Sequence, residues 1–250
     1  MTKRFGTENA VGLRNGHFPR VVLFDVDGTL IRTVRRAGYR HMITEMLEDI
    51  FGTFGRIREV DFAGKTDMAI YREALECEGI SAAVIWERLP RLEAAMVDIL
   101  SRLASTGEVF RLCTGVRELL EALSSDDRYY PSLLTGNVEK LAEAKLKLAG
   151  LWDYFPVRGA FGSDAEDRDH LPAIAAERIS ALLNTTLTPE QFIVVGDTPR
   201  DIACARHFGA RAVAVASGGH TLEQLSQCSP DALLADLGDT EAALQLLASI

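Results

Sequence analysis

The sequence predicts an α/β protein whose core is a parallel sheet and whose chain is interrupted by an inserted block of helices. Short apolar runs rich in β-branched residues alternate with helical patterns in the C-terminal part. This alternation is typical of parallel strands joined by right-handed crossovers. Residues 36–106 contain no such run and show helical periodicity instead. The 250 residues provide enough length for one large domain or two modest ones.

The first strand is predicted at residues 21–24. This continuous apolar run, VVLF, has the composition of a strand buried on both faces, and it leads directly into the polar segment DVDGTL at residues 25–30. The polar, glycine-rich residues 1–19 show no periodicity and are predicted to form an N-terminal extension.

Three helices are predicted in the inserted block. Apolar residues recur at spacings of three and four over residues 39–50, which marks one helix face. A second helix is expected at residues 66–77, before Gly79. A third is expected at residues 81–103, where Pro90 either kinks the helix or splits it in two.

Strands and helices alternate again from residue 113 onward. The predicted strands are residues 131–134, 159–161, 192–195, 212–216 and 232–235. The predicted helices are residues 116–123, 138–149, 171–183, 200–208, 221–225 and 241–249. We therefore predict one α/β core from residues 20–32 and 108–250. Residues 33–107 would form a helical domain that covers the carboxyl ends of the strands, where ligands of open α/β sheets bind.

Composition excludes several classes of protein. The net charge of −9 opposes non-specific nucleic-acid binding and, taken alone, disfavours an anionic substrate. The four cysteines are far apart and form no C-x-x-C pair, which favours reduced thiols in a cytoplasm. No apolar stretch approaches the roughly 18–20 residues of a membrane span, and the N-terminus lacks the apolar region of a secretory signal. We expect a cytoplasmic protein that is a monomer or a homodimer.

Three predicted strands end in polar clusters, at residues 25–29, 135–137 and 196–201. Carboxyl ends of parallel strands meet at one edge of a sheet, so these clusters should converge there. The carboxylates would repel one another without a cation, and oxygen ligands favour Mg²⁺. The acidic candidates are Asp25, Asp27, Asp197 and Asp201. Each cluster alone also fits a simpler interpretation, a turn at Gly28 or a helix cap at Asn137.

The three clusters, together with a basic residue, resemble a known family. DVDGTL at residues 25–30, LTGN at 134–137, a basic residue, and GDTPRD at 196–201 resemble the four motifs of the haloacid dehalogenase superfamily of phosphohydrolases. The insertion lies where the phosphoglycolate-phosphatase-like and β-phosphoglucomutase-like branch carries its helical cap. The resemblance implies a Rossmann-like, doubly wound parallel sheet with an inserted α-helical cap domain.

The resemblance also implies catalytic roles. Asp25 would be the nucleophile that forms an aspartyl-phosphate, and Asp27 would be the general acid and then the base. Asp25, Asp197 and the main-chain carbonyl of Asp27 would hold Mg²⁺, with Asp201 as a further acid at the same site. True dehalogenases of the superfamily have a non-acidic residue in place of Asp27, so this aspartate favours phosphoryl chemistry.

Phosphate binding is implied for the second and third motifs. Thr135 would bond a phosphoryl oxygen, and the amides of Gly136 and Asn137 lie at a predicted helix N-terminus suited to an anion. Arg168 is the best candidate for the basic third motif, although a solvated charged loop is the alternative. Two other basic residues are poorer candidates, since Arg158 precedes a strand and Lys145 lies in the middle of a helix.

A further loop in the insertion resembles the segment by which caps of this branch reach the active site. In it, Gly64 permits a close approach and Lys65 is placed to meet an anionic leaving group. Thr66 or Asp67 equally fits a plain helix N-cap. A cap lysine forms a Schiff base in the related phosphonoacetaldehyde hydrolase, which Lys65 alone does not establish here.

The resemblance therefore predicts a Mg²⁺-dependent phosphatase that acts on a small phosphorylated metabolite, phosphoglycolate-like or a sugar phosphate, through an aspartyl-phosphate. A phosphosugar mutase similar to β-phosphoglucomutase is the alternative. A phosphonoacetaldehyde hydrolase-like enzyme and a non-catalytic phosphate-binding module are less favoured.

Overall fold

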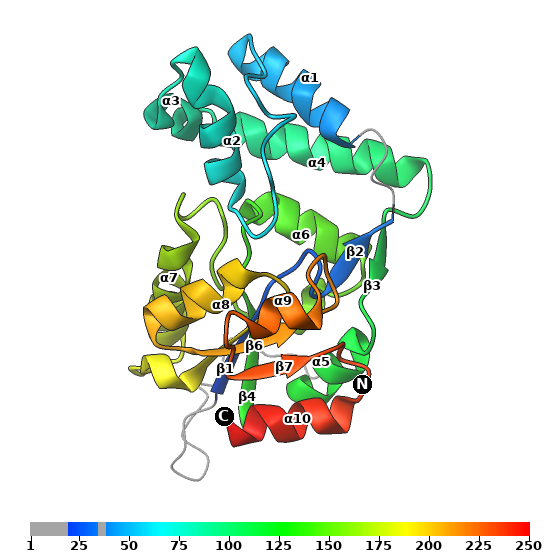
Figure 1. Cartoon of the computed structure of the whole chain (residues 1–250), viewed down its shortest axis with the longest axis vertical. Coiled ribbons are helices and arrows are strands. Elements are labelled where there is room, and N and C mark those ends of the chain that lie inside the picture. The colour runs from blue at the N-terminus through cyan, green and yellow to red at the C-terminus, as the bar shows by residue number, and fades with distance from the viewer. Residues whose placement is uncertain (1–19, 35–38) are drawn as a thin grey trace.

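A computed structural model describes residues 20–34 and 39–250 of the chain (Figure 1). The predicted N-terminal extension, residues 1–19, lies outside the described residues. Within the described ranges, no helix is both long enough and apolar enough to cross a membrane.

The core is a parallel sheet of five strands in the order β4-β1-β5-β6-β7. The strands are β1 (Arg20–Phe24), β4 (Tyr129–Leu133), β5 (Phe192–Gly196), β6 (Arg211–Val215) and β7 (Ala232–Leu234). In the register, Phe24 of β1 is level with Leu133 of β4 and Val195 of β5. The residues after these three strands therefore leave the sheet at the same edge, as predicted.

Helices cover both faces of the sheet, which makes it doubly wound. Alternate residues of β1 point to opposite faces: Val22 and Phe24 join one apolar cluster, whereas Val21 and Leu23 join the other. The helices on the first face are α5 (Val116–Ser125), α6 (Glu139–Leu148) and α10 (Thr240–Ser249). On the second face lie α7 (Leu171–Leu182), α8 (Pro199–Phe208) and α9 (Leu222–Ser226).

The inserted helices form a separate group at the top of Figure 1. They are α1 (Tyr39–Phe51), α2 (Asp67–Leu75), α3 (Ala82–Glu87) and α4 (Leu89–Ser105), and they pack around an apolar cluster of their own. Leu141 of the core helix α6 belongs to the same cluster, so α6 supports the inserted helices from below. The division of the chain at residues 33 and 107 stays a prediction.

Two short strands join the insertion to the core and were not predicted. β2 (Ile31–Thr33) and β3 (Phe110–Leu112) pair antiparallel where the chain leaves the core and returns to it. Three residues are too few for an alternating pattern to be visible in the sequence. Their pairing brings the two ends of the insertion side by side.

One predicted strand is absent, and the third predicted helix takes the second of its two predicted forms. The predicted strand at residues 159–161 is wrong, because only one isolated bridge forms there, between Ala160 and Leu134. The predicted third helix is divided into α3 and α4 at Arg88, which leaves Pro90 in the first turn of α4, where its missing N–H costs nothing.

Candidate active site

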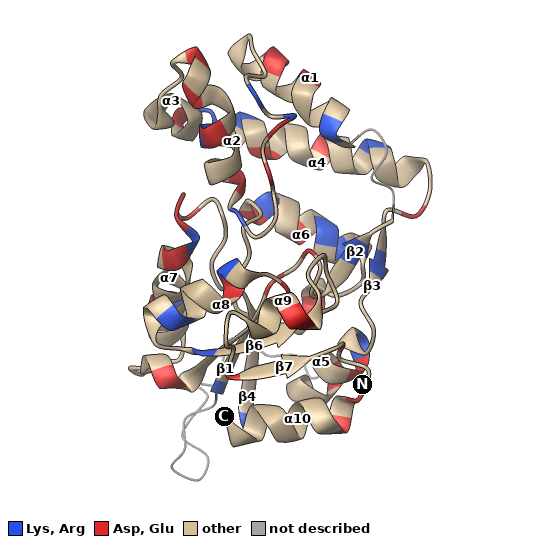
Figure 2. Ribbon diagram, in the orientation of Figure 1, with Lys and Arg blue, Asp and Glu red and all other residues tan. Residues whose placement is uncertain are grey.

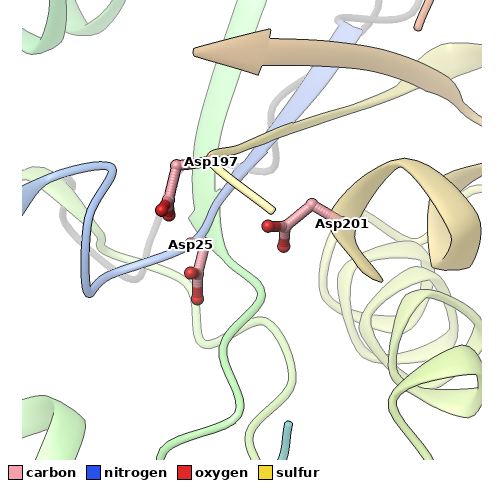
Figure 3. Close-up of side chains that lie close together, drawn as sticks. All are labelled: Asp25, Asp197 and Asp201. Carbon is pink, nitrogen blue, oxygen red and sulfur yellow. The ribbon is translucent and has the colours of Figure 1, made fainter. Parts of the chain in front are cut away.

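Three buried carboxylates meet at the carboxyl edge of the sheet. Asp25 follows β1, Asp197 follows β5, and Asp201 lies in the first turn of α8 (Figure 3). One oxygen from each lies within 4.8 Å of the others. Burial, reinforced by the neighbouring acids, raises the pKa of Asp25 to about 6 and that of Asp197 to about 8. The sheet thus brings together three of the four predicted acidic residues.

The donor set fits a hard divalent cation. Three carboxylates face one buried guanidinium, that of Arg168, so the cluster carries excess negative charge when all three are ionised. Oxygen donors in such a cluster suit Mg²⁺. The side chain of Asp27, the fourth predicted acid, lies outside this cluster and is 40% exposed.

Asp201 differs from the other two acids because both of its oxygens already have partners. Its Oδ2 accepts from the amide of Thr198 at 2.9 Å and from the Thr198 hydroxyl at 2.7 Å. Its Oδ1 pairs with Arg168. This capping arrangement holds the first turn of α8 and leaves Asp25 and Asp197 as the carboxylates better placed for a cation.

The carboxylate of Asp197 is closely packed by neighbouring residues. The Thr29 hydroxyl donates to its Oδ1 at 3.1 Å. A Cβ on Gly28 would lie 2.4 Å from its Oδ2, and a Cβ on Gly218 would lie 1.7 Å from the same atom. Both glycines are required here because the main chain passes directly over the carboxylate.

Arg168 lies on a 3₁₀ turn that precedes α7, and it is 6% exposed. Its Nη2 lies 3.3 Å from Asp25 Oδ1 and also pairs with Asp201, while its Nη1 donates to the Gly64 carbonyl at 3.3 Å. The guanidinium therefore links the predicted nucleophile, α8 and the loop of the insertion. Its position is buried, unlike the solvated loop that was the alternative interpretation.

Lys145, a poorer candidate than Arg168 for the basic third motif, also lies at the pocket, beside Asp27. Its Nζ lies 2.5 Å from Asp27 Oδ2 and 2.7 Å from Asn137 Oδ1, and its side chain is 9% exposed. Asn137 donates to the same Asp27 oxygen at 2.7 Å. Lys145 lies on the buried face of α6 beside Leu141, and a lysine on an apolar helix face was the available signal. Arg158, by contrast, pairs with Glu139 at the surface.

Thr135 and Gly136 follow β4 after one intervening residue, Leu134. Thr135 is fully buried, and its hydroxyl oxygen accepts from the Asn137 side chain at 2.9 Å and from the Asn137 amide at 3.3 Å. A Cβ on Gly136 would lie 2.1 Å from the carbonyl oxygen of Lys65. The glycine therefore lets the loop of the insertion contact the core.

The loop at residues 64–67 makes further contacts with the core. Gly64 has a φ of +65°, and a Cβ there would meet the Thr198 hydroxyl at 2.5 Å. The Thr66 hydroxyl accepts from the Ala69 amide as the N-cap of α2, and it donates to the Glu166 carbonyl at 2.5 Å. Thr66 thus fills both roles considered for it, the helix cap and the contact with the core.

Asp67 and Lys65 complete this loop. The Asp67 amide donates to the Gly136 carbonyl at 2.7 Å, and its carboxylate accepts from the Val138 amide at 2.8 Å. Burial raises the pKa of Asp67 to about 6. Lys65 forms an ion pair with Glu73 of α2, so its charge is partly compensated within the insertion.

These groups line one pocket of about 590 Å³ between the sheet edge and the inserted helices. All the residues predicted for catalysis, and most of those predicted for phosphate and metal binding, face it. From the four motifs, the lining residues are Asp25, Asp27, Thr135, Gly136, Asn137, Arg168 and Asp197; from the insertion, they include Gly64 and Lys65.

Comparisons with known proteins agree with this arrangement. A family model described as haloacid dehalogenase-like hydrolase matches residues 22–215. A probable phosphatase, IndB, from Dickeya dadantii is 29% identical over 236 residues, which cover 91% of this chain and 94% of that protein. A phosphoglycolate phosphatase from Xanthomonas campestris is 30% identical over 205 residues, covering 80% of this chain and 85% of that one.

The fold comparison gives the same result. The crystal structure of a predicted phosphoglycolate phosphatase from Haemophilus somnus has a TM-score of 0.62 at 19% identity and covers 90% of this chain and 98% of that one. At this identity the similarity establishes the fold alone. Together with the family match over most of the sequence, it shows that the chain belongs to the haloacid dehalogenase-like hydrolases.

Proposed function

We propose that the chain is a Mg²⁺-dependent phosphatase that hydrolyses a small phosphorylated metabolite through an aspartyl-phosphate. The observation that carries this proposal is the buried Asp25, set between the guanidinium of Arg168 and the carboxylate of Asp197, with Asp27 two residues further on. Asp25, Asp27 and Arg168 line one pocket, which supports their proposed roles as nucleophile, proton carrier and phosphate ligand.

The chemistry assigned to the two aspartates balances over two steps. In the first, Asp25 attacks phosphorus, the bond to the leaving oxygen breaks, and Asp27 donates a proton to that oxygen. In the second, Asp27 takes a proton from water as the water attacks the aspartyl-phosphate. Inorganic phosphate leaves and both aspartates return to their starting states.

Phosphate binding falls to the remaining motif residues. Arg168 is positioned to bond a phosphoryl oxygen while it stays beside Asp25. The Thr135 hydroxyl and the amides of Gly136 and Asn137 face the same pocket. These donors would hold the phosphoryl group in line with Asp25.

Asp25, Asp197 and the main-chain carbonyl of Asp27 would hold Mg²⁺. When bound, the cation offsets the repulsion between Asp25 and the phosphate and stabilises charge in the transition state. Asp201 contributes to this site by fixing Arg168 and the first turn of α8. We further propose that residues 33–107 act as a cap over a core of residues 20–32 and 108–250, and that the enzyme acts in the cytoplasm.

The test is phosphate release from a panel of phosphate monoesters, with Mg²⁺ and with EDTA, by the chain and by Asp25→Asn. We expect the variant to lose turnover by a factor of about 10⁴ or more while its circular dichroism stays unchanged. Asp153→Asn is the matched control, because Asp153 is exposed on the core away from the pocket. Turnover retained in Asp25→Asn would refute the nucleophile, and an isomeric sugar phosphate in place of inorganic phosphate would indicate a mutase.

A further inference from the structure

We infer that the substrate is a phosphate monoester whose leaving group carries an apolar ring. This inference rests on the proposed phosphatase function and deepens it, because it concerns the part of the same pocket that lies beyond the phosphate site. The contacts described above account only for the polar half of that pocket.

The other half is an apolar wall contributed by four separate parts of the chain. Ile70 comes from α2, Leu100 and Leu103 from α4, Val109 and Phe110 from the segment that enters β3, and Leu141 from α6. We call these six residues the apolar wall. Figure 1 shows α4 lying directly above α6, so the wall spans the seam between the inserted helices and the core. The aromatic side chains of Tyr39 and Phe62 line the same pocket.

Within the described residues, the three lysine and arginine side chains nearest the phosphate site each have a partner in the chain. Lys145 pairs with Asp27, Lys65 with Glu73, and Arg168 with two acids of the cluster. Each lies beside a carboxylate of the chain, so none is reserved for a second negative charge on the substrate.

The other two arginines that line the pocket within the described residues are exposed and bonded to the main chain. Arg32 donates to the Gly218 carbonyl at 2.6 Å. Arg40 donates to the carbonyls of Ile57 and Val60, at 3.0 Å each, and stacks over Phe62 at 4.3 Å. Figure 2 shows basic residues on β2 and β3, where the insertion joins the core, and also on α6 beneath α4. Among the described residues, a carboxylate or second phosphate against the apolar wall would lose hydration and find no lysine or arginine that lacks a partner in the chain.

The volume of the pocket also favours a leaving group larger than glycolate. A volume of about 590 Å³ falls within the range of roughly 300–1,000 Å³ typical of pockets that enclose an entire organic ligand. Leu103 and Phe110 are the two residues of the apolar wall that are only partly buried, and glycolate or a second phosphate would leave their surface against water. A ring would cover it, and the free energy of burying apolar surface would then contribute to recognition.

The experiment compares two esters of primary alcohols, benzyl phosphate and 2-phosphoglycolate, whose leaving groups differ in the ring and the carboxylate. We expect kcat/KM for benzyl phosphate to exceed that for 2-phosphoglycolate at least tenfold. Leu103→Arg, which places a cation in the apolar wall, should lower this ratio at least tenfold. Leu182→Arg is the matched control, since Leu182 is 60% exposed on α7 and lies outside the pocket lining; it should leave the ratio unchanged.

Binding of non-hydrolysable analogues separates this inference from the proposed function. Calorimetry should show that 2-phenylethylphosphonate binds at least tenfold more tightly than 2-carboxyethylphosphonate. A preference for 2-phosphoglycolate, or tighter binding of the carboxylate analogue, overturns the inference while the phosphatase function stands. Tighter binding of the phenyl analogue without hydrolysis of either ester supports the apolar site and refutes the phosphatase. If neither analogue binds, the inference is overturned.

Discussion

Replacing Lys145 with methionine tests whether this buried lysine positions the proposed acid. Methionine is similar in length and apolar, so it keeps the packing of α6 and removes only the ammonium group. The change deletes the contacts of 2.5 Å to Asp27 and 2.7 Å to Asn137. Asp27 keeps one hydrogen-bond donor, the side-chain Nδ2 of Asn137, at 2.7 Å.

The expected loss follows from these contacts. A hydrogen bond to a charged group contributes about 1.5–3 kcal/mol. Because the Asp27 side chain is 40% exposed, water replaces part of the lost interaction and the lower half of this range applies. A loss of about 1.4 kcal/mol is tenfold in rate. We therefore expect kcat to fall by about one order of magnitude.

Steady-state assays on two substrates distinguish a positioning role from a loss of folding. An alkyl phosphate needs its leaving oxygen protonated, whereas p-nitrophenolate leaves with little help, so Lys145→Met should slow the alkyl ester more. Lys147→Met is the control, because Lys147 lies two residues along α6, is 59% exposed and pairs with Glu143 of the same helix. Equal effects on the two substrates, or equal effects of the two variants, would refute the positioning role.

Two other predictions concern the loop at residues 64–67 and the three buried carboxylates. In Gly136→Ala, the new Cβ would lie 2.1 Å from the Lys65 carbonyl, so the loop at residues 64–67 must move away from the core. We expect kcat to fall at least tenfold. An unchanged kcat would contradict the contact between this loop and the core. In EDTA, the free energy of unfolding should fall as pH rises from about 4 to 8, measured by urea denaturation. The reason is that the pKa values of Asp25 (about 6), Asp67 (about 6) and Asp197 (about 8) lie above their usual 3.8, so the folded chain holds extra protons in this window. Saturating Mg²⁺ should reduce the fall by stabilising the ionised carboxylates, and a rise in stability over the same window without metal would refute the assignment.

Much of the candidate site was predictable because its residues directly follow strands. Asp25, Thr135 and Asp197 come one or two residues after apolar runs, and parallel pairing places such positions at one edge. Their convergence therefore follows from the strand pattern and the topology, without any knowledge of side-chain contacts. The double winding follows from the same alternation of strands and helices.

Other parts of the site depend on contacts between distant segments. Lys145 reaches Asp27 only because α6 packs beneath the inserted helices with its lysine turned inward. Asp67 looked like part of a helix cap, and its contact with Val138 joins segments 71 residues apart. Asp201 was predicted as a metal ligand and lies in the acidic cluster, and its contacts with Thr198 and Arg168 could not be foreseen from the sequence. No local pattern encodes such pairings.

The acidic edge of the sheet, formed by residues that follow β1 and β5, was determined by the sequence. Hydrophobic periodicity and the ends of strands are local properties of the chain, so they can be recognised without the fold. Tertiary structure alone decided which charges are paired and what surrounds the space between them. The apolar wall is the clearest case, since Leu103 and Leu141 belong to helices that are separate in sequence and meet only through packing. Burial raises the pKa of Asp197 and also makes the apolar wall apolar on its pocket side. Burial depends on which segments pack together, so it is decided only when the chain folds.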